Sequence, residues 1–318
     1  MINFSSEFNL NISGHRDIEF VDVPVDTDVR LFIDPGLIES GQDPFSRACA
    51  ADMKAYFDSV FECCRREDYT ELRRLFACCA EINHTHLGNS QNRPCGRGAS
   101  EKILMDIFTA MIEQRLFEQG IILSPCDVYV LARNFDKDRM SDLLTNVLQH
   151  QLVRFTNHVC DTMGVPQSRV SGGRFWDAEA QQWCIGSWRL PVVGINPIIL
   201  VPKWFVSQSY HYTTGGYISK FLLEYRKQYH LDTRSDLCHE REMKNGTLKL
   251  VPPTKAELRA KELAGQPYKE HAIDFVLNNP DTMDRFLTER VARFKEGEFT
   301  LSDHELDMLL YTSRFRSA

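Results

Sequence analysis

Residues 83–102, NHTHLGNSQNRPCGRGASEK, combine imidazole, thiol, guanidinium and glycine groups in one short stretch. Such groups bind zinc or phosphate, so chemistry is expected here first. A zinc site needs imidazole and thiolate ligands that converge in a tetrahedron, and cysteine pairs at C-x2-C spacing often supply part of the set. No cysteine pair here has that spacing, but a zinc site stays open. Its ligands would come from Cys78, Cys79, His84, His86 and Cys95.

Phosphate binding accounts for more of the residue types in this segment than zinc binding does. Glycines let backbone N–H groups approach an anion closely, and a helix expected after Gly98 would point its positive end towards it. Guanidinium groups add paired donors for phosphate oxygens. The predicted phosphate-binding residues are Arg93, Gly96, Arg97 and Gly98. A turn-rich loop without a ligand accounts for the composition equally well, and neither the Walker pattern nor G-x-G-x2-G after a strand is present.

The segment CDVYVLARNFDKDRMSD, residues 126–142, carries four aspartates around the expected start of a helix. Asp138 and Asp142 are four positions apart and share one helical face if the helix begins early. Two carboxylates on one face can share a divalent cation, which polarises a phosphodiester and activates water. Helix capping is the alternative, with Asp138 or Ser141 as the cap and Asp142 near the positive end of the helix dipole.

A metal-dependent phosphodiesterase would take its groups from several expected strand ends. For Mg²⁺ or Mn²⁺ the predicted ligands are Asp34, Asp138 and Asp142, and the predicted catalytic residues are Asp127, Asp142 and Lys203. Lys203 follows the apolar run PIILVP, where its ammonium group could neutralise developing negative charge. Position 201 holds valine, so the E-x-K or D-x-K element of strand-borne nuclease sites is absent. A solvated lysine at a strand end fits equally well.

The bulk composition narrows the class of protein. The chain has 318 residues, of which 43% are hydrophobic and 25% charged, and a net charge of −7. This charge argues against a generally basic nucleic-acid-binding surface but leaves a local basic channel open. Neither H-E-x2-H nor G-x-S-x-G occurs, which argues against a zinc protease and an esterase. Without a long apolar run or a secretory signal, we expect a cytoplasmic protein with no membrane partner.

Hydrophobic periodicity predicts an α+β fold, in which a small mixed sheet carries several packed helices and a helical part follows. We expect an α+β core domain at 1–210 and a mainly helical C-terminal region at 211–318. Strands are expected at 18–33 and 126–135, and as a hairpin plus a buried strand across 170–206. Helices are expected as a pair within 46–80, at 99–119, from 136 to a cap at Gly164, at 217–229 and from 254 onward.

The order of LFIDPGLIES, HTHLGNSQNRPCGRG, FDKDRMSDLLTNVL and IILVPKWFV resembles an uncharacterised family of bacterial proteins found beside antiviral defence genes. The similarity covers roughly residues 20–206. It implies a cytosolic bacterial component of anti-phage defence, an effector with a partner protein. It assigns no catalytic residue.

Three hypotheses about function follow. The first is a metal-dependent phosphodiesterase, a nuclease whose partner is nucleic acid. The second is a non-enzymatic sensor or adaptor, which binds a partner protein or a phosphate-bearing ligand. The third is hydrolysis of a small nucleotide. The sequence predicts neither the substrate nor the oligomeric state.

Overall fold

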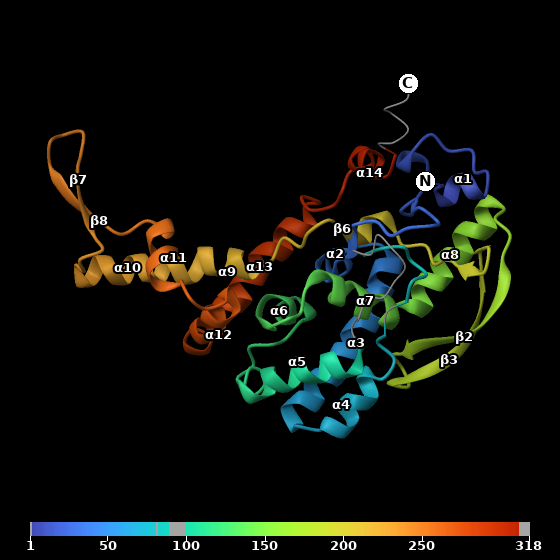
Figure 1. Cartoon of the computed structure of the whole chain (residues 1–318), viewed down its shortest axis with the longest axis horizontal. Helices are drawn as coiled ribbons and strands as arrows, with labels where there is room; N and C mark the ends of the chain where they lie inside the picture. Colours follow the sequence, from blue (N-terminus) through green and yellow to red (C-terminus); the bar gives the residue numbers. More distant parts are fainter. Residues whose placement is uncertain (1, 81, 89–99, 312–318) are drawn as a thin grey trace.

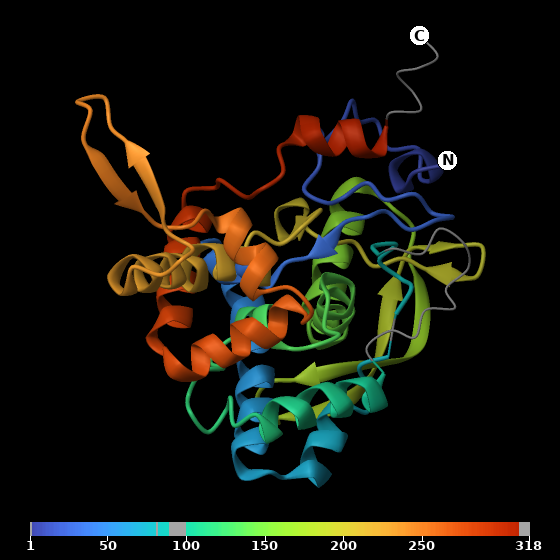
Figure 2. The same cartoon turned by 60° about the vertical axis from the view of Figure 1, so that its left-hand side comes forward.

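The computed structural model describes residues 2–80, 82–88 and 100–311, and its fold is α+β with helices predominating (Figures 1 and 2). The predicted fold class is therefore confirmed. The strands among these residues pair as four separate two-stranded antiparallel sheets, whereas we expected one small mixed sheet. Helix packing, rather than a central sheet, consequently forms the framework.

The described helices fall into two groups, one before and one after residue 210. The first group is α1 Phe4–Glu7, α2 Pro35–Ser40, α3 Pro44–Arg66, α4 Tyr69–Phe76, α5 Glu101–Glu113, α6 Pro125–Leu131, α7 Lys137–Val147 and α8 Gln149–Met163. The second group is α9 Thr214–Tyr217, α10 Leu223–Thr233, α11 Lys255–Glu262, α12 Tyr268–Asn278, α13 Asp281–Lys295 and α14 Asp303–Leu310. Shorter turns are the 3-10 helices η1 His15–Asp17 and η2 Lys203–Phe205 and the π-helical η3 Ile218–Leu222.

The sheets are small, and each joins two strands. The pairs are β1 Phe32–Ile33 with β6 Val206–Ser207, β2 Ser168–Asp177 with β3 Gln182–Leu190, β4 Val192–Val193 with β5 Asn196–Pro197, and β7 His239–Glu242 with β8 Leu248–Val251. The hairpin that we predicted after residue 170 is confirmed as β2–β3. The hairpin β7–β8 was not predicted.

Helix α3 is central to the first group because it is long and carries a broad apolar face. Asp43 caps its N-terminus by accepting the backbone N–H of Ser46 at 2.9 Å, and Pro44 occupies its first turn. The buried face of α3 contacts α4, α5, α7 and α8. The pair of helices predicted within 46–80 is confirmed as α3 and α4.

The helix predicted from residue 136 is present as α7 and α8, which meet at Leu148 and end at Gly164 with a φ of 71°. The predicted caps were wrong, because Asp136 accepts the backbone N–H of Arg139 at 3.1 Å and thereby caps α7. The hydroxyl of Ser141 instead accepts the backbone N–H of Ile33 at 3.0 Å. This bond attaches α7 to β1.

The strand predicted at residues 126–135 is wrong, because helix α6 occupies most of this segment. Ser124 and Asp127 form a capping box, in which each side chain accepts the backbone N–H of the other, and Pro125 stands in the first turn. The β-branched residues Val128 and Val130 suggested a strand, but both are buried on a helix. The capping box at the start of α6 therefore outweighed the strand preference of the β-branched residues.

Two extended segments that we predicted as strands, residues 18–33 and the apolar run after Pro197, contain little regular sheet. Their backbone groups bond to scattered partners. The N–H of Val21 donates to the carbonyl of Val201 at 3.0 Å, and the N–H of Ile199 donates to that of His84 at 2.8 Å. A buried extended chain outside a sheet needs such partners, because unpaired backbone groups are costly.

After residue 213 the chain forms an arm that projects from the main body, with α10, α11 and the hairpin β7–β8 at its far end (Figure 1). The chain then returns through α12 and α13, and α13 packs on α2. Buried apolar residues of both parts, such as Phe32 and Phe286, belong to one continuous core. The division at residue 210 stays a prediction.

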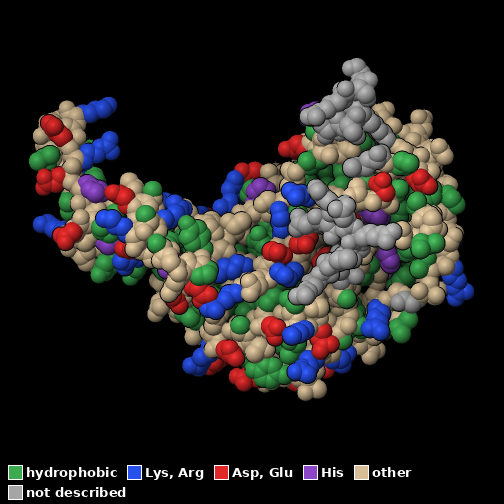
Figure 3. All heavy atoms as spheres, in the orientation of Figure 1, with side chains coloured by type: hydrophobic (Ala, Val, Ile, Leu, Met, Phe, Trp, Pro, Cys, Tyr) green, Lys and Arg blue, Asp and Glu red, His purple; other side chains and the backbone are tan. Residues whose placement is uncertain are grey.

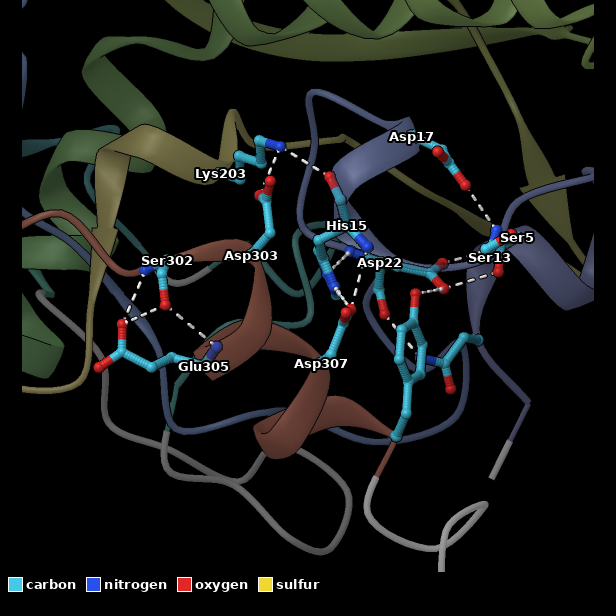
Figure 4. Close-up of polar contacts among 12 residues, drawn as sticks. Ser5, Ser13, His15, Asp17, Asp22, Lys203, Ser302, Asp303, Glu305 and Asp307 are labelled. Carbon is cyan, nitrogen blue, oxygen red and sulfur yellow. Dashed lines mark hydrogen bonds and ion pairs between the residues drawn. The ribbon is translucent and has the colours of Figure 1, made fainter.

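Segments from both ends of the chain meet in a buried polar cluster (Figure 4). Asp307 in α14 accepts the Nδ1–H of His15 at 2.7 Å and the backbone N–H of the same residue at 2.9 Å. The Nε2 of His15 accepts the backbone N–H of Asp22 at 3.2 Å, which fixes the ring proton on Nδ1. Asp22 also binds Ser5 and Tyr311. One ring nitrogen of His15 thus binds α14, and the other binds the extended segment that contains Asp22.

We predict that Asp307→Ala lowers the free energy of unfolding by about 2 kcal/mol, because two donors of the buried His15 lose their acceptor. The matched control is Asp303→Ala, which removes a more exposed partner of Lys203 in the same helix and should cost about 1 kcal/mol or less. Urea unfolding followed by circular dichroism measures both. Equal costs for the two variants would contradict the role given to His15.

Candidate functional site

Asp34 lies at the N-terminus of α2, where it is fully buried and surrounded by donors. Its carboxylate accepts the hydroxyls of Tyr212 at 2.7 Å and Ser207 at 3.1 Å, and the backbone N–H of Gly36 at 2.9 Å. Burial raises the pKa of Asp34 to about 6, and these hydrogen bonds oppose that rise. Asp34 therefore caps α2 and ties it to residues 207–212. This geometry argues against the metal-binding role that we predicted.

Asp127 has a similar structural role in α6. Its Oδ2 accepts the backbone N–H groups of Leu123 and Ser124, each at 2.8 Å, and the side chain is buried. Burial raises the pKa of Asp127 to about 6, while these hydrogen bonds act against the rise. The carboxylate is thus committed to the helix start, which argues against the catalytic role that we predicted.

Lys203, the third predicted catalytic residue, belongs to the cluster between the two chain ends (Figure 4). Its Nζ donates to the backbone carbonyl of His15 and to Asp303, both at 2.6 Å. The ammonium group is therefore directed at α14 and η1, not at the predicted metal ligands. The buried strand that we expected to present it is an irregular segment that ends in η2.

Asp138 and Asp142 do share one face of α7, because this helix begins at Lys137. Both are partly buried. The Oδ1 of Asp138 lies 3.3 Å from the position that a Cβ on Gly88 would take. Gly88 has a φ of 140°, a backbone conformation that favours glycine. A side chain at position 88 would therefore be strained and would crowd the carboxylate.

A further carboxylate, Asp28, interacts with Asp138 from the extended segment before β1. Burial first, and the negative charge of Asp138 second, raise the pKa of Asp28 to about 6. Sequence reasoning missed Asp28, because it lay inside a predicted strand and far along the chain from Asp138. Its one visible signal is the pair Asp26 and Asp28, two positions apart and therefore on one side of an extended chain.

Two imidazoles complete the candidate site, which we define as Asp28, His84, His86 and Asp138. An isolated parallel bridge between Val29 and Leu87 brings the segments together, and His86 Nδ1 lies 3.7 Å from Asp28 Oδ1. The Nδ1 of His84 and the Nε2 of His86 are buried and have no hydrogen-bond partner among the described residues. Burial lowers the pKa of both imidazoles, so both are neutral at pH 7.

The backbone of His86 is itself unusual. Its φ of 53° lies in the left-handed region, which costs a residue with a Cβ about 1–2 kcal/mol. The carbonyl of His86 accepts the N–H of Val29 at 3.0 Å, and the N–H of Gly88 donates to the carbonyl of Val29 at 2.9 Å. These bonds hold the strained residue beside Asp28. Strain of this kind concentrates at functional sites.

Metal binding depends on how many ligands converge. Within residues 2–80, 82–88 and 100–311, no group of three or more His, Cys, Asp or Glu side chains is arranged to hold a metal ion. Magnesium, however, commonly takes only one or two protein carboxylates and completes its octahedron with waters and substrate phosphates. Asp28 and Asp138, whose charges interact, would supply that number of carboxylates.

The predicted phosphate-binding residues and one of the predicted zinc ligands fall in a segment that the structure does not describe. Arg93, Cys95, Gly96, Arg97 and Gly98 lie outside the described residues. Of the other predicted zinc ligands, Cys79 is buried in the core with its Sγ 3.3 Å from the hydroxyl of Tyr56, and Cys78 contacts Arg174. The phosphate and zinc sites stay predictions.

A separate pocket of about 460 Å³ lies between α2, α6 and α13. Glu39 lines it. Although the residue as a whole is exposed, desolvation of its carboxyl group, followed by the charges of Asp127 and Asp34, raises the pKa of Glu39 to about 7. Arg290 lines the same pocket and forms no ion pair with any described residue. The sequence contained no signal for either residue, because the pocket forms only when α13 returns to the main body.

The geometry thus defines an α+β protein with an Asp/His site between three distant segments. A family model described as a domain of unknown function, DUF8370, matches residues 9–213, and the chain belongs to this family. No curated protein and no solved structure matches the chain. In the described part of the chain, no helix is long and apolar enough to span a lipid bilayer.

The buried carboxylate of Asp127 generates a pH prediction. Its folded pKa of about 6 exceeds the ordinary 3.8, so the folded state binds the proton more tightly than the unfolded state does. The stability from this group is fully present below about pH 4 and is lost as the pH rises through 6. Asp127→Asn keeps an oxygen acceptor but removes the titration. Relative to the wild type it should gain stability between about pH 4 and 6, by at most about 1.4 kcal/mol per pH unit.

Urea unfolding of both proteins at several pH values measures this difference. Parallel stability profiles for the two proteins would show that Asp127 does not titrate in this range.

Proposed function

We propose that this chain is a cytoplasmic component of bacterial anti-phage defence that hydrolyses phosphodiesters, with nucleic acid as substrate and Mg²⁺ or Mn²⁺ as cofactor. One observation carries the proposal: the carboxylates of Asp28 and Asp138 interact beside the neutral imidazole of His86, whose buried Nε2 has no partner among the described residues. The defence context rests on the sequence resemblance.

Asp28 and Asp138 are the residues that would hold the cation, and two carboxylates with waters and phosphate oxygens suit Mg²⁺ or Mn²⁺. A bound cation would supply charge to polarise a phosphoryl oxygen and lower the pKa of a water. Asp142 lies one helical turn beyond Asp138 on the same face of α7, where it adds negative charge.

His86 is the residue best suited to proton transfer. Its Nδ1 lies 3.7 Å from Asp28 Oδ1, and the charge of Asp26 and a backbone hydrogen bond with Thr27 oppose the effect of burial on its pKa. A proton on Nδ1 leaves the Nε2 lone pair free to accept a proton from an attacking water, and a neutral ring at pH 7 is ready for this step. A carboxylate or carbonyl near the second ring nitrogen is usual for histidines in metal sites.

We predict that Asp28→Asn and Asp138→Asn each lower Mn²⁺- or Mg²⁺-dependent cleavage of DNA or RNA by at least about 100-fold, because each removes a cation ligand. The matched control is Asp136→Ser, which keeps an N-cap at the exposed start of the same helix and should retain full activity. Gel analysis of labelled substrates measures cleavage.

Metal binding gives a second measurement that does not depend on turnover. Mn²⁺ should raise the melting temperature of the wild type and of Asp136→Ser, but not of Asp28→Asn, because only the folded state binds the ion. Cleavage that continues in EDTA and in Asp138→Asn, without any Mn²⁺-dependent rise, would remove the proposal.

The pocket between α2, α6 and α13 favours a second function, that of a sensor for a phosphate-bearing small molecule. Arg290 and Lys295 supply positive charge on one wall, and the carboxylate of Glu39 can accept hydrogen bonds from amino groups on the other. Apolar residues such as Val291 and Ile121 lie between them. This combination of an apolar surface with a few charged groups is usual for ligand pockets.

For this second function, the wild type is tested against a panel of nucleoside mono-, di- and triphosphates. We predict that at least one of them raises its melting temperature by a few degrees, because ligand binding near saturation stabilises the folded state by about 3 kcal/mol. Arg290→Ala should abolish the rise. The control Arg285→Ala alters the same helix outside the pocket and should preserve it. A rise that persists in Arg290→Ala, or no rise with any nucleotide, would contradict the sensor function.

A further inference from the structure

The hairpin β7–β8 stands apart from the main body at the end of the arm (Figures 1 and 2). Every residue of β7 is exposed, and Leu248 at the start of β8 is 66% exposed. A contact near its base joins His239 to Glu257 of α11 at 2.9 Å. An isolated two-stranded hairpin is marginally stable in water, so a surface this open gains little for the fold itself.

The strand register sorts the hairpin side chains onto two faces. Arg241 pairs with Lys249, and because side chains alternate along a strand, these two share one face with His239 and Val251. Glu240 and Glu242 lie on the opposite face, paired with Leu250 and Leu248. One face is therefore basic, and the other is acidic and apolar.

The pairing of Arg241 with Lys249 is unfavourable for the hairpin alone. Like charges directly opposite each other destabilise a strand pair. Neither side chain forms an ion pair with any described residue, and the acids of β7 point to the other face. An external anion would remove this repulsion.

The turn at the tip is well defined and adds a third cation. The N–H of Met243 donates to the carbonyl of Thr247 at 2.9 Å, and Gly246 takes a φ of 76°. Asn245 accepts the hydroxyl of Thr247 at 2.7 Å. These contacts order the turn that carries Lys244, so the basic groups are presented by a defined surface.

The arm also differs in charge from the rest of the protein. Residues 218–263 contain ten Lys and Arg and seven Asp and Glu, whereas the whole chain contains 37 and 44. Figure 3 shows Lys and Arg side chains on the side of the hairpin that faces the main body, and acidic side chains on its outer side. The positive face is thus turned toward the hollow between arm and main body.

We propose that the basic face of β7–β8, formed by Arg241 and Lys249, together with Lys244 in the turn at the tip, binds the phosphate backbone of double-stranded DNA. A two-stranded β-ribbon fits the major groove of B-DNA, which is about 12 Å wide. Guanidinium and ammonium groups neutralise phosphates and release counterions, which gives affinity without base-specific contacts. Duplex DNA would then be the substrate of the proposed phosphodiesterase. Only this identification of the substrate rests on the proposed function.

The test is binding of a fluorescent DNA duplex of about 30 base pairs in EDTA, measured by anisotropy between about 50 and 200 mM KCl. The wild type should bind, more weakly as salt rises. Arg241→Ala/Lys249→Ala should reduce the slope of log affinity against log salt by about two and lower the affinity at low salt by about 10-fold.

Three control variants keep the test decisive. Glu240→Gln/Glu242→Gln changes the opposite face and should bind at least as tightly as the wild type. Arg241→Lys/Lys249→Arg conserves the charge and should retain the salt slope, which separates a charge effect from misfolding. Asp138→Asn should bind normally even where cleavage is lost, so failure of the site and failure of the hairpin are distinguishable. Absence of duplex binding, or an unchanged slope in Arg241→Ala/Lys249→Ala, overturns the inference.

Discussion

The structure depends on one extended segment, residues 18–34, which is largely buried at both ends, partly exposed at 25–30, and outside any sheet for most of its length. A buried chain in this state must find a partner for each backbone group, since orphaned groups cost more than most single contacts contribute. The partners come from the whole molecule. They include the ring of His15, the carbonyl of Phe205 and the hydroxyl of Ser141. Distant segments are consequently fixed relative to one another.

Three aspartates along this segment connect it to different parts of the protein. Asp22 holds the two chain ends together, and Asp34 caps α2 and binds Tyr212. Asp28, between them, interacts with Asp138 and His86 instead of with a set of donors. Asp22 and Asp34 have structural roles, because their carboxylate oxygens accept hydrogen bonds within the fold. Asp28 Oδ1 lies 3.7 Å from Nδ1 of His86, whose Nε2 has no partner among the described residues, and this difference distinguishes the candidate site.

The arm presents the opposite physical situation. Most of the chain buries its polar groups against compensating partners, but β7–β8 exposes both faces and places like charges opposite one another. Its proposed ligand and the proposed phosphodiesterase site both concern phosphate, although they stand on separate observations. The basic arm also explains how a chain with a net charge of −7 could approach nucleic acid, since local rather than total charge governs such contacts.

The sequence alone determined the helices and the hairpin that have strong local sequence signals. The apolar periodicity of α3, α4, α5, α7 and α8, the glycine cap at Gly164 and the β2–β3 hairpin could all be predicted, because neighbouring residues decide them. Local signals also explain the wrong strand prediction at residues 126–135. The capping box at Ser124 was present in the sequence, but we gave more weight to the β-branched residues. The extended segments were misread because alternation indicates an extended chain, not its pairing partner.

Only the tertiary structure decided which partners each aspartate meets. Asp34, Asp127 and Asp138 each lie near the start of a helix in the structure, although the sequence suggested a strand around Asp127. Asp34 accepts the hydroxyl of the distant Tyr212, Asp127 accepts backbone N–H groups of its neighbours Leu123 and Ser124, and Asp138 interacts with Asp28 across 110 positions. Desolvation and charge act through space, so no local pattern could assign them.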